Sequence, residues 1–203
     1  IRGARLEATR LRIVRARGFA ASADLAGSQL VLTDASVEEM DVGNGGDFGS
    51  PLIVKGGASV VAERVRLVGG VTAGVALVGL GTSATVTDLH VEGIRPPQSE
   101  GGLWGTGIAV GVGARLEGSR VRVAEVHDCG LLVEGAGAVV TLTDTTVLGT
   151  SLRCLDNPAC QQRVAVGVSS QGGARLSLSR FQVASNGGIG VQVLGKIDRF
   201  VVR

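Results

Sequence analysis

The sequence predicts an all-β solenoid: a right-handed parallel β-helix of about seven to eight coils, with three strands per coil and a coil length near 24 residues. One motif recurs along the chain, and within each copy apolar residues alternate with polar or small ones, which is typical of strands. The 33 glycines and the 2% aromatic content also favour short strands joined by tight turns over helices. We expect a single domain that spans residues 1–203.

Each copy of the motif begins at a glycine. The seven starts are Gly3, Gly27, Gly57, Gly81, Gly113, Gly137 and Gly173. The steps between them are 24, 30, 24, 32, 24 and 36 residues, so every second copy is followed by an insertion of 6, 8 or 12 residues. The insertions lie near residues 41–50, 95–106 and 151–162. Because they share one phase of the repeat, we expect them along one edge of the stack, which is the natural binding surface.

Two apolar columns predict the core. Three residues after each start the column reads Leu6, Leu30, Val60, Ala84, Leu116, Val140 and Leu176. Ten residues after each start it reads Ile13, Val37, Leu67, Val91, Val123, Val147 and Val183. A third strand precedes each start, for example in residues 107–113 and 130–136, and three strands would close each coil into a triangular prism.

A charged residue stands seven positions after each start, and its sign alternates from copy to copy. This charged column reads Arg10, Asp34, Arg64, Asp88, Arg120, Asp144 and Arg180. Adjacent parallel strands lie about 4.8 Å apart, so each Arg should have an Asp above and below it. Exposed ion pairs contribute little individually, but a repeated set can fix the register. We interpret the column as structural and not catalytic.

The three cysteines indicate two different environments. Cys154 and Cys160 flank Asn157 and Pro158, which favour a turn, so we expect a disulfide between them, with two free thiols as the alternative. A disulfide would indicate folding in an oxidising compartment. Cys129 lies within a strand pattern and should be buried and unpaired.

The Gly-x-x-Val/Leu pattern of the coils, together with the turn Val183-Ala-Ser-Asn-Gly-Gly-Ile-Gly190, resembles the right-handed parallel β-helix, or pectin-lyase-like, superfamily and especially its bacterial surface repeat proteins. Asn186 matches the asparagine that these folds often place at a coil corner. The resemblance covers nearly the whole chain and implies the fold. It does not define the function, because the relatives include enzymes that cleave acidic polysaccharides as well as non-catalytic adhesins, stalks and tailspikes.

The sequence assembles no specific catalytic site of this superfamily, although nonspecific carboxylate pairs such as Glu38 with Glu39, or Glu7 with Glu63, are conceivable. A lyase would need clustered carboxylates that hold calcium beside a basic residue, and a glycoside hydrolase would need two carboxyl groups about 5–10 Å apart. The aspartates of the charged column are two coils apart and neutralised by arginine, so they provide no such cluster. The Asn-Thr-Asp, Asp-Asp and Gly-His-Gly signatures of the relatives are also missing from the sequence.

The insertions carry the candidate binding residues. They are Asp41, Asn44, Asp47, Glu100, Trp104, Asp156 and Asn157. The first three lie among glycines and could hold calcium, but the tandem nonapeptides of calcium-binding β-rolls are missing, so a plain glycine turn is preferred and no cofactor is assigned. Trp104, the only tryptophan, could stack on a sugar or anchor a partner, or fold back over the neighbouring coil.

We therefore expect a non-catalytic, secreted or cell-surface scaffold or adhesin that presents its loops to a polysaccharide or a surface protein. The alternative is a polysaccharide lyase or glycoside hydrolase of this fold, or the inert flank of one. A net charge of +2 disfavours nucleic acid as a partner, and no apolar stretch is long enough to cross a membrane. The chain begins at Ile1 without an initiator methionine or signal-peptide pattern, so we expect a piece of a longer protein. Uncapped coil ends would favour end-to-end self-association.

Overall fold

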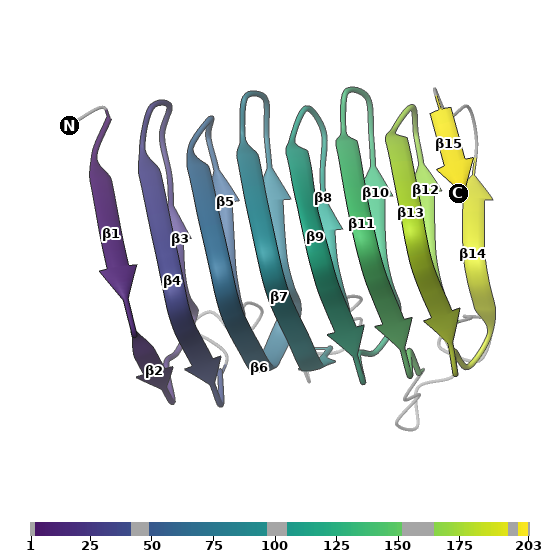
Figure 1. Ribbon diagram of the computed structural model, residues 1–203, viewed down its shortest axis with the longest axis horizontal. Coiled ribbons are helices and arrows are strands. Elements are labelled where there is room, and N and C mark those ends of the chain that lie inside the picture. Colours follow the sequence, from purple (N-terminus) through teal and green to yellow (C-terminus); the bar gives the residue numbers. More distant parts are fainter. Residues whose placement is uncertain (1–2, 42–48, 97–104, 152–164, 195–198, 203) are drawn as a thin grey trace.

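The computed structural model describes residues 3–41, 49–96, 105–151, 165–194 and 199–202, the last of these for the backbone alone. The described residues form strands and turns without a helix, so this part of the chain contains no helix that could cross a membrane. Their strands join into one fifteen-stranded sheet, and all pairings between named strands are parallel (Figure 1). This confirms the predicted all-β, parallel solenoid.

The strands form two rows that run along the stack. The repeat row contains the strands that follow the glycine starts: β1 (Arg5–Thr9), β2 (Arg12–Val14), β4 (Gln29–Glu38), the first half of β6 (Ser59–Val78), β7 (Ser83–Arg95), β9 (Arg115–Ala124), β11 (Val139–Leu148), β13 (Arg175–Ala184) and β15 (Arg199–Val202). The return row leads back to the next start: β3 (Phe19–Ala23), β5 (Ser50–Lys55), the second half of β6, β8 (Gly105–Val110), β10 (Cys129–Glu134), β12 (Val166–Gln171) and β14 (Ile189–Leu194).

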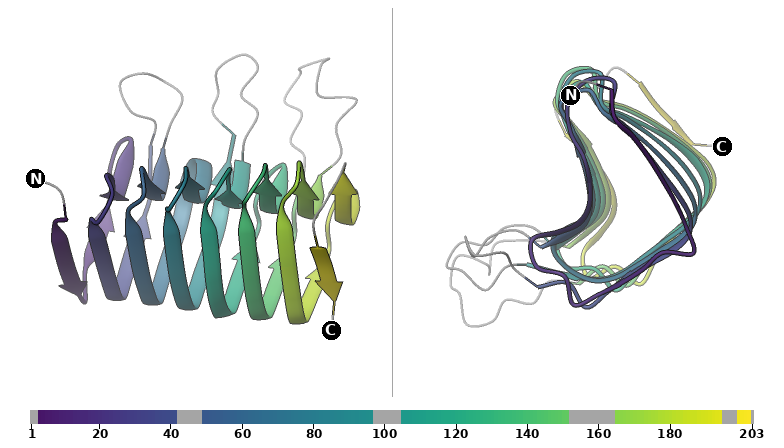
Figure 2. Two further views of the ribbon diagram at one scale, coloured as in Figure 1. Left: turned by 90° about the horizontal axis from the view of Figure 1, so that it is seen from above. Right: turned by 90° about the vertical axis from the view of Figure 1, so that its left-hand side faces the viewer.

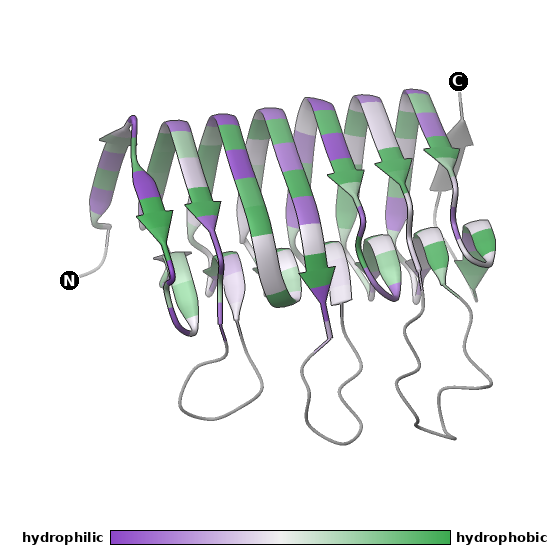
Figure 3. Cartoon of the chain, turned by 90° about the horizontal axis from the view of Figure 1, so that it is seen from below, coloured by the Kyte–Doolittle hydropathy of each residue, from purple (hydrophilic) through white to green (hydrophobic). Residues whose placement is uncertain are grey.

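The predicted apolar columns are in register. Leu116 pairs with Ala84 on one side and Val140 on the other, and Val123 pairs with Val91 and Val147. From the second start to the sixth, both columns are almost completely buried. Along each strand, hydrophobic residues that face the interior alternate with hydrophilic residues that face outward, and this alternation is visible as coloured bands (Figure 3). At the first coil Leu6 remains 63% exposed, because only one neighbouring strand covers it.

The charged column bends the repeat row. All seven of its residues have φ between 48° and 55°, in the left-handed region. This conformation is uncommon for residues other than glycine, asparagine and aspartate. The bend separates β1 from β2, whereas strands such as β9 run continuously through it. The sequence predicted three strands per coil closing a triangular prism. In most coils the structure instead has one long bent strand and one return strand.

A second left-handed column forms the next corner, twelve residues after each start. Its members are Arg15, Glu39, Gly69, Gly93, Glu125, Gly149 and Ser185. Asn186 follows this corner, and its Oδ1 accepts a hydrogen bond from the Thr150 backbone N–H at 3.2 Å. Viewed along the stack, the cross-section is bent and the return row lies on its concave side (Figure 2).

Glycines bring the two rows together inside the solenoid. Gly74, Gly107, Gly130 and Gly167 stand at equivalent positions of the return row, opposite the buried valine column of the repeat row. A Cβ at Gly130 would overlap Cγ1 of Val147, and the other three glycines face Val91, Val123 and Val183 in the same way. The thin interior therefore requires the glycines.

Candidate functional site

The charged column forms paired rather than continuous contacts. Arg120 donates two hydrogen bonds to Asp88, at 2.5 and 2.8 Å, and Arg180 donates two to Asp144, both at 2.7 Å. Arg64 likewise holds Asp34 through two bonds. Each of these arginines binds the aspartate of the preceding repeat. The sequence predicted contact with the aspartates on both sides. A planar guanidinium that binds one carboxylate with two nitrogens is oriented by that partner, and Arg64 uses its remaining nitrogen to bind Glu63.

These bonds set the ionisation of the column. The hydrogen bond from arginine is the largest influence on Asp34, Asp88 and Asp144, and it lowers the pKa of each carboxyl below its ordinary value. The carboxylates are thus charged and neutralised at neutral pH. This state suits a structural role and leaves none of the three as a free base or nucleophile.

The described flanks of the three insertions lie along one edge. Asp41 pairs with Arg17 across a bridge, Val71 pairs with Arg95, and His127 pairs with Ser151, all at the same level of the repeat. The ends of each insertion also approach each other: a Cβ at Gly49 would lie 2.8 Å from the Asp41 carbonyl oxygen, and one at Gly105 would lie 3.0 Å from the Pro96 nitrogen. The predicted common edge is therefore present at the level of the flanks.

Most of the predicted binding residues lie outside the described residues. Asp41 is described and exposed. The others, Asn44, Asp47, Glu100, Trp104, Asp156 and Asn157, fall outside, as do Cys154 and Cys160 of the expected disulfide. Within the described ranges, no group of three or more His, Cys, Asp or Glu residues is arranged to hold a metal ion.

Cys129 is free and buried, as predicted. It packs with Leu132, Val166 and the partly buried Ile189 in a small apolar cluster of the return row. Burial is the main reason that the pKa of its thiol rises to about 12, and the nearby Asp128 adds to the effect. The sulfur is therefore a neutral thiol at physiological pH, which indicates a packing role rather than a nucleophile.

A charged cleft of about 540 Å³ lies at the edge of the insertion flanks. Its lining residues are Arg15, Arg17, Glu39, Met40, Asp41, Gly69, Gly93 and Arg95. The Arg15 Nε donates to Glu39 at 3.1 Å, whereas Arg17 and Arg95 form no ion pair with another described residue. Gly69 and Gly93 have no side chains to fill this corner, and the cleft is open for that reason. Two exposed guanidinium groups remain available for hydrogen bonds to an acceptor-rich ligand.

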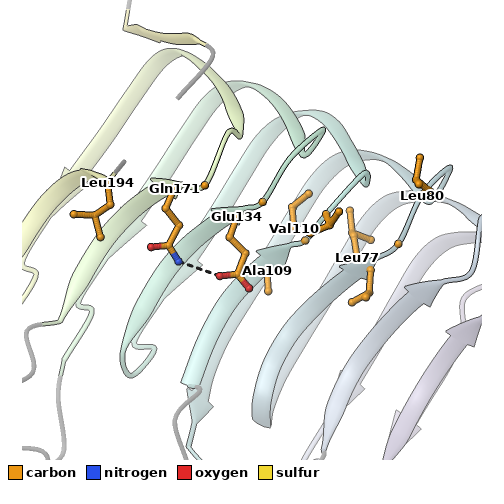
Figure 4. A pocket seen from close by; sticks show the side chains of 13 residues that line it. Leu77, Leu80, Ala109, Val110, Glu134, Gln171 and Leu194 are labelled. Atoms are coloured by element: carbon orange, nitrogen blue, oxygen red, sulfur yellow. Dashed lines mark hydrogen bonds between the residues drawn. The ribbon is translucent and has the colours of Figure 1, made fainter. Parts of the chain in front are cut away.

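A second and larger cavity, the return groove, lies at the opposite end of the return strands, beside the glycine turns. Its volume is about 710 Å³, and its lining residues are Leu77, Val78, Gly79, Leu80, Ala109, Val110, Gly111, Val112, Glu134, Gly135, Gln171, Gly172 and Leu194 (Figure 4). It spans β6, β8, β10, β12 and β14. Apart from Glu134 and Gln171, the side chains are aliphatic, and no aromatic residue is among the described residues that line it.

The return groove contains one polar pair. Gln171 donates from Nε2 to Oε2 of Glu134 at 3.0 Å, and both side chains are partly buried (Figure 4). Glu134 forms no ion pair with any described residue. The carboxylate thus lies in apolar surroundings with one amide donor and without a cation, which leaves acceptor capacity for a ligand.

Reasoning from the sequence did not identify the return groove, although the repeat contains the signal. The residue just before each start is Ala26, Gly56, Leu80, Val112, Ala136 and Gly172 from the second copy onward. Large aliphatic residues stand at this exposed turn position only in two consecutive copies. Comparison down this column would have identified Leu80 and Val112 as exceptions.

No protein-family model and no curated protein matches the chain. Among solved structures, one match is the TibC-catalyzed hyper-glycosylated TibA55-350 fragment, with 11% identity, 96% of this chain and 97% of that chain covered, and a TM-score of 0.16. Another is HetL, a pentapeptide repeat protein involved in heterocyst differentiation regulation from the cyanobacterium Nostoc sp. strain PCC 7120, with 9% identity, coverage of 93% and 87%, and a TM-score of 0.16. TM-scores this low carry no argument about this chain.

Proposed function

We propose that the chain is a non-catalytic scaffold or adhesin, secreted or exposed at a cell surface, that binds a glycan or a surface protein along its insertion edge. The charged cleft beside the insertion flanks is the observation that carries the proposal. A solenoid that only separated two domains would need no such cleft, and loops on a rigid scaffold are where binding residues usually gather.

The fold proposed for this function is the right-handed parallel β-helix of the pectin-lyase-like superfamily, with about seven to eight coils. The regular register, the glycine turns and the asparagine at the corner support this assignment. In such a solenoid the core columns carry the stability. Changes at the insertion edge should therefore affect binding without unfolding the protein.

Binding of the purified chain to an array of bacterial and plant glycans would test the proposal. Arg95→Ala and Trp104→Ala should each weaken the binding at least tenfold, because the first removes hydrogen-bond donors from the cleft and the second removes the only indole. The matched control is Arg115→Ala, which removes an exposed arginine of β9 far from the cleft. Equal binding by all three variants would place the functional surface elsewhere.

Catalysis needs a separate assay. The chain is incubated with polygalacturonate and alginate, with and without calcium, and unsaturated products and new reducing ends are measured. We expect no turnover. Cleavage that persists in independently prepared samples would support the lyase or hydrolase alternative instead.

A further inference from the structure

The return groove lies away from the insertion edge, at the other end of the return strands. Insertions precede strands such as β8, which starts at Gly105, whereas the groove is lined by the residues at and after the end of that strand, Val110 to Val112. A ligand in the return groove would therefore occupy a different surface from a ligand of the charged cleft.

The internal repeat shows that the apolar wall of the groove is not needed for folding. Alanine or glycine occupies the position of Leu80 and Val112 in the other described copies from the second start onward, and the position is an exposed turn in each of them. Leu80 is nevertheless 83% exposed and Val112 is 55% exposed. Together with the exposed Val78 and Leu194, they form an aliphatic patch within a single groove. Such concentrated apolar exposure is typical of interaction sites.

The carboxylate of Glu134 indicates the charge that a ligand of the return groove would carry. It stands between the aliphatic residues of β8 and the Leu194 end of the groove, and among the described residues its side chain is hydrogen-bonded to the neutral Gln171 amide (Figure 4). A cation placed there would add charge-assisted hydrogen bonds to this carboxylate.

We propose that the return groove binds an extended segment of a partner protein in which a lysine or arginine is flanked by aliphatic side chains. Five adjacent strands line the groove, so its length along the stack is about 19 Å at a spacing near 4.8 Å, and this length accommodates about six extended residues. A lipid chain would bring no cation to the Glu134 carboxylate. A glycan would find neither an aromatic platform nor several hydrogen-bonding side chains among the described lining residues.

Selection of a random heptapeptide phage library on the intact chain tests this proposal. The enriched peptides should carry lysine or arginine between aliphatic residues. On the Glu134→Lys variant, the same selection should enrich aspartate or glutamate at that position. A charge-independent or acidic consensus on the parent chain would overturn the proposal.

A synthetic peptide with the selected consensus then serves as the probe in fluorescence anisotropy. The double variant Leu80→Ala with Val112→Ala should lower its affinity at least tenfold. The control Leu25→Ala, which removes a 55% exposed aliphatic residue at a turn outside the groove, should leave it unchanged. Circular dichroism verifies that each variant is folded. Equal affinity of the double variant and the parent, or competition by a glycan bound at the insertion edge, would refute a separate peptide site.

Discussion

Gly130→Ala is the sharpest test of how the solenoid is packed. Gly130 is buried in β10, and an added Cβ would overlap Cγ1 of Val147 and lie 2.5 Å from the carbonyl oxygen of Gly167. The valine methyl belongs to a rigid β-branched side chain, and the carbonyl belongs to the next return strand. Neither neighbour can move away without separating the two rows or shifting β12.

The expected cost follows from this geometry. Overpacking a close-packed core costs about 1–3 kcal/mol, and a clash with backbone belongs at the upper end of that range. For a chain of this size, 1 kcal/mol lowers Tm by about 2–4 °C, so about 3 kcal/mol corresponds to a fall of about 6–12 °C. Alanine also stabilises by restricting the unfolded chain, by about 0.4–1 kcal/mol. That gain applies equally to a matched glycine elsewhere.

Gly190→Ala is the matched control, because Gly190 occupies the same column but is exposed. Its Cβ would meet only Cγ1 of Val183, at an ordinary 3.9 Å. Thermal unfolding followed by circular dichroism should show a large loss of Tm for Gly130→Ala and no loss for Gly190→Ala. Equal Tm values for the two variants would refute the close approach of the two rows.

Two further predictions concern ionisation and burial. Because arginine lowers the native pKa of Asp34, Asp88 and Asp144, their contribution to stability is complete above the ordinary aspartate pKa near 3.9 and is lost as pH falls through the lowered native values. The free energy of unfolding is measured by urea titration from pH 6 to pH 2. It should fall less steeply with decreasing pH for Asp88→Asn than for the parent chain. Identical slopes would contradict the stabilising role of the bond from Arg120 to Asp88. Cys129 should resist iodoacetamide until the chain unfolds, since its thiol is buried and its pKa is raised to about 12; mass spectrometry showing rapid native alkylation would contradict its placement.

The repeat allowed the fold to be predicted with its register. Once the seven starts are aligned, each apolar column must stack on itself, because shifting a strand by one residue would turn its whole apolar face outward. The structure pairs Leu116 with Val140 and Val123 with Val147 as this alignment requires. No knowledge of a relative was needed for that step.

The bend at the charged column was not predicted, although the sequence contains a trace of it. The inward-facing positions are the buried Leu116 and the partly buried Gly118, then the buried Val121 and Val123, so the period of two is interrupted between Gly118 and Val121. The interruption coincides with the left-handed Arg120. The aspartates of the column favour this conformation but its arginines do not, so the residue types of the column did not reveal the bend.

Some residues differ in size from the others at the same position of the repeat. These exceptions can be separated by whether the packing of neighbouring residues explains the change in size. Gly118 interrupts an inward column that elsewhere contains Ala, Val or Leu, but its space is filled, because an added Cβ would lie 2.6 Å from the carbonyl oxygen of Val86 and 3.3 Å from Leu142. Packing explains that exception completely. Leu80 and Val112 depart in the opposite way, since they add aliphatic surface outside the core and leave most of it in water. Their contacts with the turns at Gly113 and Gly135 leave most of that surface uncovered. For this reason the return groove, rather than the charged column, is the place where the structure suggests a second partner.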